Sequence, residues 1–306
     1  MGSKTGILVQ KKKNKVSSYV LVVALTVLTY YTLVGIWPFL YNIFLTFRKT
    51  DLITTDKFIG FKNYGYLVKD PIFLKSLLHN IVYLFVLVGF GIVTSLFIAL
   101  LISNTSGGMK KLYTAMFFAP VVTSMVAISL VWSLLYFPKI GVFANVINAV
   151  IGKDRNTLTF LQNPSTALLW IIFMDMWRDT GIRVVIFLAG MDEIPDSLYE
   201  SAVIAGASKL RQFFKITMPL LIPQIVFIVA VFSINAIRVY VPVYMMTGSP
   251  PGGPANSTIV LGLHMYLRSF YGQRFGYGAT ISMVMFVILF GLVLLEIKAM
   301  RKDWEY

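Results

Sequence analysis

Long apolar runs separated by short polar segments dominate this chain. Six runs are long enough to cross a bilayer core about 30 Å thick, which takes roughly 20 apolar residues per helix. They cover about 17–47, 77–103, 112–136, 166–189, 219–246 and 277–298. The runs do not alternate apolar and polar residues as the strands of a transmembrane β-barrel do. The pattern therefore predicts an all-α integral membrane protein with six transmembrane helices.

The composition strengthens this prediction. Of the 306 residues, 57% are hydrophobic and 13% are charged, whereas a soluble domain carries about a quarter charged residues. Cysteine is absent, and His79 and His264 lie far apart in the sequence. We therefore expect no disulfide, no metal site and no cofactor bound by this chain. The net charge of +14 is typical of basic residues that flank spans and meet anionic lipid headgroups.

A lysine cluster at 11–15 indicates the orientation. The apolar run after it exceeds the core of about 7–15 residues found in a signal peptide, so we expect a retained span, bent or ended by Pro38. Basic residues favour the cytoplasmic side, and six spans return the C-terminus there too. Against this orientation, the first outside loop, 48–76, alone holds six Lys or Arg residues. The expected parts are a cytoplasmic tail at 1–16, one membrane domain at 17–300 and a cytoplasmic tail at 301–306.

The largest inward-facing segment, about 190–218, is the most informative polar part of the chain. Ser197 and Glu200 have the spacing of a capping box, which predicts the start of a helix. Small residues follow, and Gly206 is placed to end this short helix. Small residues allow a partner's backbone to approach closely.

A second short helix is predicted after Gly206. It would expose Phe213 and Phe214 as apolar anchors before Pro219 opens the fifth span. Such a helical turn at the membrane surface suits docking into a groove of another protein. An ordinary interfacial amphipathic loop explains the same pattern, and the residues alone leave both interpretations open.

Charged residues inside the fourth apolar run form a second candidate site. Asp175, Arg178, Asp179 and Ile182 recur at the spacing of one helix face. Ionisable groups in a span are costly, so they usually face a cavity or a partner. The fifth run adds Asn235, Arg238 and Tyr240. These groups could line a substrate cavity, or they could pair structurally at a subunit interface or near the outer water boundary.

The segment Glu200-Ser201-Ala202-x-x-Ala205-Gly206-Ala207, followed by Phe214-x-x-Thr217-x-Pro219, resembles a known family loop. It is similar to the E-A-A-x-x-x-G-A loop of permease subunits of binding-protein-dependent ABC importers. In that family the loop forms coupling helices that sit in a cleft of the cytoplasmic ATPase. Ser201 stands where the family usually has Ala, and Ala205 where it often has Asp. Both residues are small, so the close-packing role survives, while a polar contact made by the Asp would be lost.

Further segments resemble the carbohydrate-uptake branch of this family, over nearly the whole chain from about residue 20. They are Phe58 to Tyr64 with Asp70-Pro71 and Asn80, Thr247 to Thr258, and Phe275 to Ala279. The resemblance implies ATPase-coupling roles for Glu200, Ser201, Ala202, Ala205, Gly206, Ala207, Phe213, Phe214 and Pro219. It implies substrate-binding roles for Asp175, Arg178, Asp179, Ile182, Asn235, Arg238, Val239 and Tyr240.

The resemblance also implies partners and a location. They are a second permease subunit, usually a different chain, two cytoplasmic ATPase subunits, an extracytoplasmic solute-binding protein and a sugar, in the plasma membrane of a prokaryote. No Walker A sequence, G-x-x-x-x-G-K-[ST], occurs in this chain. We therefore expect a non-catalytic subunit, with ATP and Mg²⁺ on the partner ATPase. Arg178, Arg183 and Arg238 outnumber the two intramembrane aspartates, which suggests an acidic oligosaccharide as substrate.

Three other classes explain the sequence less well. An ion-coupled secondary transporter would usually have more spans with internal repeats, and it needs no ATPase-docking loop. A potassium channel filter is suggested by Gly276-Tyr277-Gly278, but Arg274-Phe275 precedes it in place of the required Thr-Val. A membrane enzyme would need a nucleophile with a base, a metal cluster or an acid pair in a pocket. The chain contains no Gly-x-Ser-x-Gly and no H-E-x-x-H sequence.

Overall fold

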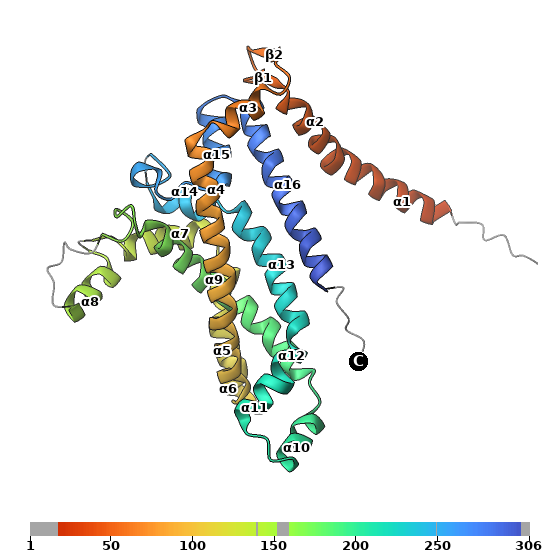
Figure 1. The fold of residues 1–306 in the computed structure, drawn as a ribbon, viewed down its shortest axis with the longest axis vertical. Coiled ribbons are helices and arrows are strands. Elements are labelled where there is room, and N and C mark those ends of the chain that lie inside the picture. Colours follow the sequence, from red (N-terminus) through yellow and green to blue (C-terminus); the bar gives the residue numbers. More distant parts are fainter. Residues whose placement is uncertain (1–17, 139, 152–158, 249, 301–306) are drawn as a thin grey trace, which may run out of the picture.

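The computed structural model describes residues 18–138, 140–151, 159–248 and 250–300. They form an elongated bundle of helices with a small two-stranded hairpin at one end and a helical turn at the other (Figure 1). The predicted all-α class is confirmed, since the strands of the hairpin are three residues long. The predicted tails, 1–16 and 301–306, lie outside the described residues.

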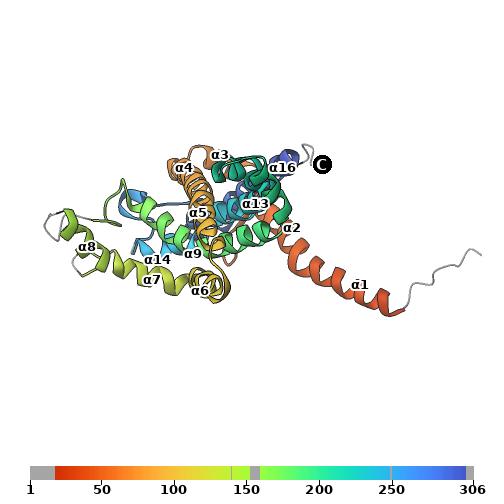
Figure 2. The same ribbon diagram turned by 90° about the horizontal axis from the view of Figure 1, so that it is seen from below.

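The first span is a rod of three helical pieces that projects from the bundle (Figures 1 and 2). The pieces are α1 (Ser18–Tyr31), the π-helical turn η1 (Thr32–Ile36) and α2 (Trp37–Thr46). Pro38 has no N–H to donate to the carbonyl four residues earlier, and the π turn lies just before it. The helix expected to bend or end at Pro38 therefore widens there and continues to Thr46.

The hairpin end and the second span follow. The hairpin pairs β1 (Arg48–Thr50) with β2 (Asp56–Phe58) in antiparallel fashion, and α3 (Lys62–Val68) comes next. The second span joins α4 (Pro71–Leu84), the π-helical η2 (Phe85–Phe90) and α5 (Gly91–Ser103). It begins six residues before the predicted start at 77. Asp70 explains this extension, because its carboxylate caps the helix by accepting the N–H of Ile72 at 2.9 Å.

The predicted third span, 112–136, is wrong as a single helix. The chain forms α6 (Gly107–Phe118), the 3₁₀ turn η3 (Ala119–Val122) and α7 (Met125–Leu135), and the axis turns by 99° between the last two. Pro120 cannot continue the hydrogen bonding of α6, and Thr123 is extended, with ψ of 145°. α8 (Val142–Ile151) follows, between the third and fourth predicted spans.

The fourth and fifth apolar runs flank the helical turn. α9 (Ala167–Asp192) has 26 residues and a length of about 39 Å. The turn contains α10 (Asp196–Ile204) and α11 (Lys209–Gln212). The return path is the π-helical η4 (Phe213–Thr217), α12 (Met218–Leu220), α13 (Ile222–Arg238) and α14 (Val241–Met246).

The predicted fifth span, 219–246, is therefore interrupted twice. The axis bends by 58° between α12 and α13, so Pro219 precedes the long helix, in which Pro223 takes the second position. At the other end, Val239 is extended with ψ of 134°, and Pro242 then lies in the first turn of α14. The remaining elements are the 3₁₀ turn η5 (Pro254–Asn256), α15 (Leu261–Tyr266), the π-helical η6 (Leu267–Tyr271) and α16 (Phe275–Met300).

By length and composition, three described helices qualify as spans: Tyr19–Thr46, Pro71–Ser103 and Phe275–Lys298. The number rises to five if each of the two bent pairs, α6–α7 and α11–α13, is counted as one span. The remaining predicted span, the fourth, is α9, which carries four charged residues within its middle turns: Asp175, Arg178, Asp179 and Arg183. A total of six spans therefore remains a prediction.

Three apolar clusters hold the bundle together. One lies among α4, α7, α9 and α14, the second among α5, α9 and α13, and the third among α3, α4, α15 and α16. The fully buried Asn80 of α4 links two further elements. Its amide donates to the carbonyls of Ala236 at 2.8 Å and Ile237 at 3.2 Å, and its oxygen accepts the N–H of Leu261 at 2.7 Å. These bonds satisfy backbone groups at the end of α13 and at the start of α15.

Candidate coupling loop and membrane-embedded polar residues

The helical turn between α9 and α13 lies at the end of the bundle opposite the hairpin (Figure 1). α10 ends in a Schellman motif. The N–H of Ala207 donates to the carbonyl of Ala202, and the N–H of Gly206 donates to that of Val203, each at 2.9 Å. Gly206 has φ of +74°, a conformation that residues with a Cβ rarely adopt. The prediction that Gly206 ends this helix is confirmed.

The start of α10 differs from the prediction. The helix begins at Asp196, and Pro195 occupies the N-cap without a side-chain cap. Ser197 therefore already lies inside the first turn, and the capping box predicted for Ser197 and Glu200 is wrong. Pro195 has φ of −62°, which leads the chain into the helix, and the Asp196 carboxylate interacts favourably with the N-terminal end of the helix dipole.

The turn exposes most of the residues for which coupling was predicted. Neither α10 nor α11 contains a buried residue. Glu200, Ser201, Ala205 and Gly206 are exposed, and Ala202, Ala207 and Pro219 are half-buried. Ile204 is 88% exposed and Phe214 is 59% exposed. Phe213 was expected to be exposed as well, but it packs against the cluster of α5, α9 and α13. The fold therefore leaves the apolar side chains of Ile204 and Phe214 uncovered.

Two side-chain contacts tie the turn to the bundle. The hydroxyls of Tyr199 in α10 and Thr217 in η4 share a hydrogen bond of 2.8 Å. At the end of α9, Asp192 accepts from the ammonium of Lys110 in α6, at 2.8 Å. The first bond links the two arms of the turn.

The predicted substrate residues of α9 share one helix face, but most of them are already engaged within the chain. Asp175 is 5% exposed and accepts the hydroxyl of Tyr83 from α4 at 2.7 Å. Arg178 pairs with the neighbouring Asp179 at 2.8 Å. Ile182 is half-buried and packs against the cluster of α5, α9 and α13. This arrangement agrees with the structural interpretation of these charges, and it leaves Arg178 half-exposed.

Arg183 is a buried charge whose environment the sequence did not reveal. Its side chain is fully buried, and its guanidinium lies 4.1 Å from the ring centroid of Phe232 in α13. A Cβ on Gly91 of α5 would lie 2.7 Å from its Nη1, so a larger residue there would displace the guanidinium. The i, i+4 spacing from Asp179 suggests a charge pair, but among the described residues Arg183 forms no ion pair, and its three guanidinium nitrogens have no hydrogen-bond partner. The contacts to Gly91 and Phe232 are long-range.

The predicted residues at the end of α13 are more accessible. Asn235 and Arg238 are exposed, Val239 is buried and Tyr240 is 38% exposed. Among the described residues, no hydrogen bond or ion pair joins this group to Asp175, Arg178 or Asp179. The structure therefore places the two halves of the predicted site on neighbouring helices without direct polar contact.

A group of aromatic rings lies next to Arg238, and the site prediction included only one of them, Tyr240. Tyr240 stacks on Tyr266 of α15 with ring centroids 5.7 Å apart. The hydroxyls of Tyr244 and Tyr271 share a hydrogen bond of 2.9 Å, and Phe270 lies against Tyr266 at 5.0 Å. The i, i+4 and i, i+5 spacing after Tyr266 is the only signal in the sequence, and it also fits an ordinary helix surface.

Comparison with known proteins places this architecture. Residues 91–299, from α5 through most of α16, match the family of the binding-protein-dependent transport system inner membrane component. The chain is 31% identical over 296 residues to the probable ABC transporter permease protein YurN of Bacillus subtilis (strain 168), covering 96% of this chain and 99% of that one. The chain belongs to this family of permeases.

Other relatives agree. The permease is 33% identical over 247 residues to the lactose transport system permease protein LacF of Rhizobium radiobacter, covering 80% of this chain and 82% of that one. Its fold matches a chain of the crystal structure of a bacterial alginate ABC transporter in complex with an alginate pentasaccharide-bound periplasmic protein. The TM-score is 0.79 at 20% identity, over 93% of the permease and 95% of that chain.

Proposed function

We propose that the permease is one of two membrane subunits of an ATP-driven importer for sugars, working with two cytoplasmic ATPase subunits and an extracytoplasmic binding protein. The exposed α10–α11 turn carries this proposal. It is folded mostly by its own hydrogen bonds, neither of its two helices contains a buried residue, and the apolar side chains of Ile204 in α10 and Phe214 just after α11 are exposed. A short helix of this kind suits docking into a groove. ATP and Mg²⁺ would be held by the ATPase chains.

The two helices that leave the turn explain how movement would reach the substrate. α9 leads from the turn to Asp175 and Arg178, and α13 leads from it to Arg238. Closure of the ATPase pair would shift the turn, and packed helices transmit such a shift as a rigid-body movement. The Tyr199–Thr217 bond would make both arms move together. The pathway between the two membrane subunits would then open toward the binding protein, and hydrolysis would reset it.

The proposed site for sugar includes Arg178, Asn235, Arg238 and Tyr240. The less exposed residues Asp175, Asp179, Ile182 and Val239 would support these side chains. Aromatic faces cover the apolar patches of a sugar, and the stacked rings of Tyr240 and Tyr266 provide such a face. The transport of lactose named for LacF supports a sugar as the substrate class. Because Arg178 is paired with Asp179 and Arg183 is fully buried, an acidic group on the sugar would meet Arg238.

Orientation completes the proposal. Both termini and the α10–α11 turn would lie in the cytoplasm of a prokaryotic cell, and the hairpin end would lie outside. The outside loops, especially 247–276, would contact the binding protein.

Uncoupling variants test the docking role. Gly206→Asp adds a negative charge to the surface proposed to enter the groove of the ATPase, and Glu200→Lys reverses the charge at position 200. Both positions are exposed. We expect either variant to insert normally but to lose most substrate uptake, with ATP hydrolysis no longer stimulated by loaded binding protein. Ser201→Ala is the matched control and should transport normally. Normal uptake by both charge variants would contradict the docking role.

Uptake assays with neutral and acidic oligosaccharides test the substrate charge. We expect Arg238→Ala to weaken uptake of an acidic oligosaccharide by roughly tenfold, the scale of one lost charge-assisted hydrogen bond of about 1.5 kcal/mol. Transport of neutral sugars alone, unaffected by the substitution, would remove the acidic substrate from the proposal.

A further inference from the structure

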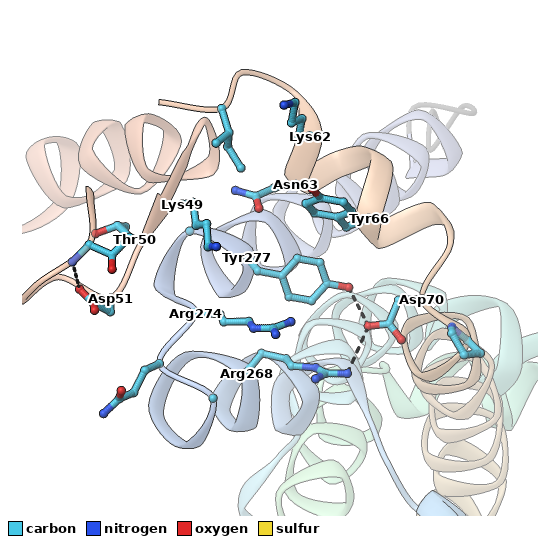
Figure 3. Close-up of a pocket in the computed structure, with 16 residues that line it drawn as sticks. Lys49, Thr50, Asp51, Lys62, Asn63, Tyr66, Asp70, Arg268, Arg274 and Tyr277 are labelled. Carbon is cyan, nitrogen blue, oxygen red and sulfur yellow. Dashed lines mark hydrogen bonds and ion pairs between the residues drawn. The ribbon is translucent and has the colours of Figure 1, made fainter. Parts of the chain in front are cut away.

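A recessed cavity of about 770 Å³ lies at the hairpin end of the permease. Its walls come from the hairpin, α3, the start of α4, and the junction of η6 with α16 (Figure 3). Four basic residues line it: Lys49, Lys62, Arg268 and Arg274. Two acidic residues, Asp51 and Asp70, also line it. Whether the cavity is basic in effect depends on what these two carboxylates already bind.

The carboxylate of Asp51 is already hydrogen-bonded within its own loop. It accepts the N–H groups of Ile53 at 2.9 Å, Thr54 at 2.8 Å and Thr55 at 2.7 Å, and it also accepts the hydroxyl of Thr54. These bonds, led by the one from the Thr54 hydroxyl, hold the pKa of Asp51 well below its usual value. Its lone pairs therefore serve the loop between β1 and β2.

The carboxylate of Asp70 already has partners from four elements: the start of α4, α15, η6 and α16. It accepts the hydroxyl of Tyr277 at 2.7 Å and the N–H of Ile72 at 2.9 Å. Arg268 lies 3.6 Å and His264 3.3 Å from the same carboxylate. Burial alone would raise the pKa of Asp70, but these bonds and charges together lower it. The group stays ionised and already has its partners.

Three cations therefore remain without a counterion in the cavity. Within the described residues, Lys49, Lys62 and Arg274 form no ion pair. In Figure 3, Lys49 and Arg274 extend toward Tyr277, and Lys62 lies at the rim. The basic residues that looked misplaced in an outside loop are thus partly accounted for. Arg48 pairs with Asp56 at 2.7 Å, Lys75 donates to the carbonyl of Ala255, and the cavity gathers two more.

The depth of the cavity indicates what kind of anion it meets. Three candidate spans end or begin beside it, at Thr46, Pro71 and Phe275, and Lys49, Asp70 and Arg274 of its lining lie within three positions of these span ends. This is the level of lipid headgroups. Tyr66, which lines the cavity, is 59% exposed, and tyrosine and tryptophan side chains concentrate at this level of a membrane.

The cavity is also held in shape by the backbone around it. The amide of Asn63 donates to the carbonyls of Thr46 at 2.8 Å and Arg48 at 2.9 Å, which fixes α3 against the hairpin. A Cβ on Gly276 would clash with the carbonyl of Arg48, so α16 approaches the hairpin as closely as glycine permits. A pre-formed pocket of this kind loses little entropy when it binds a ligand.

We propose that this cavity binds a phosphoryl oxyanion, supplied by the headgroup of an anionic phospholipid in the leaflet at the hairpin end. Arginine and lysine donate charge-assisted hydrogen bonds to phosphate oxygens, and Arg274 can do so with two nitrogens at once. The site is separate from the proposed sugar pathway and from the α10–α11 turn. Only the naming of the leaflet as the outer one rests on the orientation proposed above.

The test compares two double variants of the permease in its purified complex. Lys49→Gln with Arg274→Gln removes two cavity charges, whereas Lys57→Gln with Lys69→Gln removes two charges at the same end that do not line the cavity; all four side chains are exposed. The complex in neutral detergent is titrated with phosphatidylglycerol, then with phosphatidylcholine, and its thermal unfolding midpoint is followed. We expect half-saturation by phosphatidylglycerol to need roughly 30-fold more lipid in the cavity variant, from about 1 kcal/mol per basic residue. The control variant should match wild type.

Inorganic phosphate distinguishes the two sources of the oxyanion. If millimolar phosphate produces the same midpoint shift and the cavity variant abolishes it, the oxyanion site stands with a soluble anion as its ligand. Equal responses of both double variants to phosphatidylglycerol would overturn the proposal. The proposal would also be overturned if neither lipid nor phosphate shifts the midpoint and only an acidic oligosaccharide or the binding protein produces a shift that the cavity variant loses. The transport activity of the cavity variant does not test lipid binding. The role of the α10–α11 turn in transport is tested separately by Gly206→Asp and Glu200→Lys.

Discussion

The α10–α11 turn and the hairpin end of the permease are both polar, but their polar groups have different tasks. At the turn, the hydrogen bonds are mostly local, and apolar side chains such as Ile204 face solvent. At the hairpin end, Asn63, Asp70 and Asn80 bind groups from several helices far apart in the sequence. A locally folded surface can move as a unit against a partner, whereas a long-range network fixes a geometry. Substitutions at the two ends should therefore fail in different ways.

The largest effect on stability is expected from Gly276→Ala. The new Cβ would meet the backbone carbonyl of Arg48, which cannot move aside as a flexible side chain can. We expect a loss of about 3 kcal/mol in the free energy of unfolding, at the upper end for overpacking. Gly291→Ala in the same helix is the matched control, because nothing lies within 4 Å of its Cβ position. Equal unfolding midpoints for the two variants would show that α16 does not pack on the hairpin as described.

A pH-dependent loss of stability should arise at the same end. Burial, opposed by the nearby Asp70, lowers the pKa of His264 to about 4 from its ordinary 6.5. The unfolded chain therefore binds a proton that the folded chain refuses between these values. Stability should fall as the pH falls from about 6.5 to about 4, by up to about 3 kcal/mol.

His264→Gln is the control for this pH effect, since Gln does not titrate while Asp70, Arg268 and Tyr277 around it are unchanged. Unfolding midpoints measured across this pH range should have a shallower slope for the variant. Identical slopes would mean that His264 is not the group that titrates.

A smaller effect is expected from Gly206→Ala in the turn. The strain of φ at +74° for a residue with a Cβ is about 1 kcal/mol, and it acts on the Schellman motif alone. We expect faster hydrogen exchange at the amides of Gly206 and Ala207 with an unchanged unfolding midpoint. Gly206→Asn should exchange more slowly than Gly206→Ala, because Asn tolerates positive φ. A shift of the global midpoint would show that the turn is part of the core.

Local signals in the sequence predicted the turn better than the spans. Gly206 ends α10 because a helix C-terminus of this type is decided by the residues within it. The third and fifth apolar runs were predicted as single spans, but Pro120 and Val239 interrupt them. The mean hydropathy of a segment reports how apolar it is and carries no information on the direction of the helix axis. A bend of 99° therefore leaves the mean hydropathy of the third run unchanged.

The polar residues of the membrane domain were only partly predictable for a related reason. The i, i+3, i+4 spacing placed Asp175, Arg178 and Asp179 on one face, and the structure agrees. Their partners come from elsewhere, because Tyr83 lies 92 residues before Asp175, and such pairings depend on packing between helices. The cavity at the hairpin end joins residues from both ends of the chain for the same reason, and no local pattern could have signalled it.

Site-specific crosslinking tests the central claim, that an ATPase docks on the α10–α11 turn, most directly. The chain has no cysteine, so Ile204→Cys and Ile53→Cys each introduce a single thiol at positions that are 88% and 86% exposed, one at each end. With a thiol-to-amine crosslinker applied to the assembled complex in membranes, we predict that Ile204→Cys joins the ATPase subunit and Ile53→Cys does not. A crosslink from Ile53→Cys to the ATPase, or full transport with none from Ile204→Cys, would contradict the account.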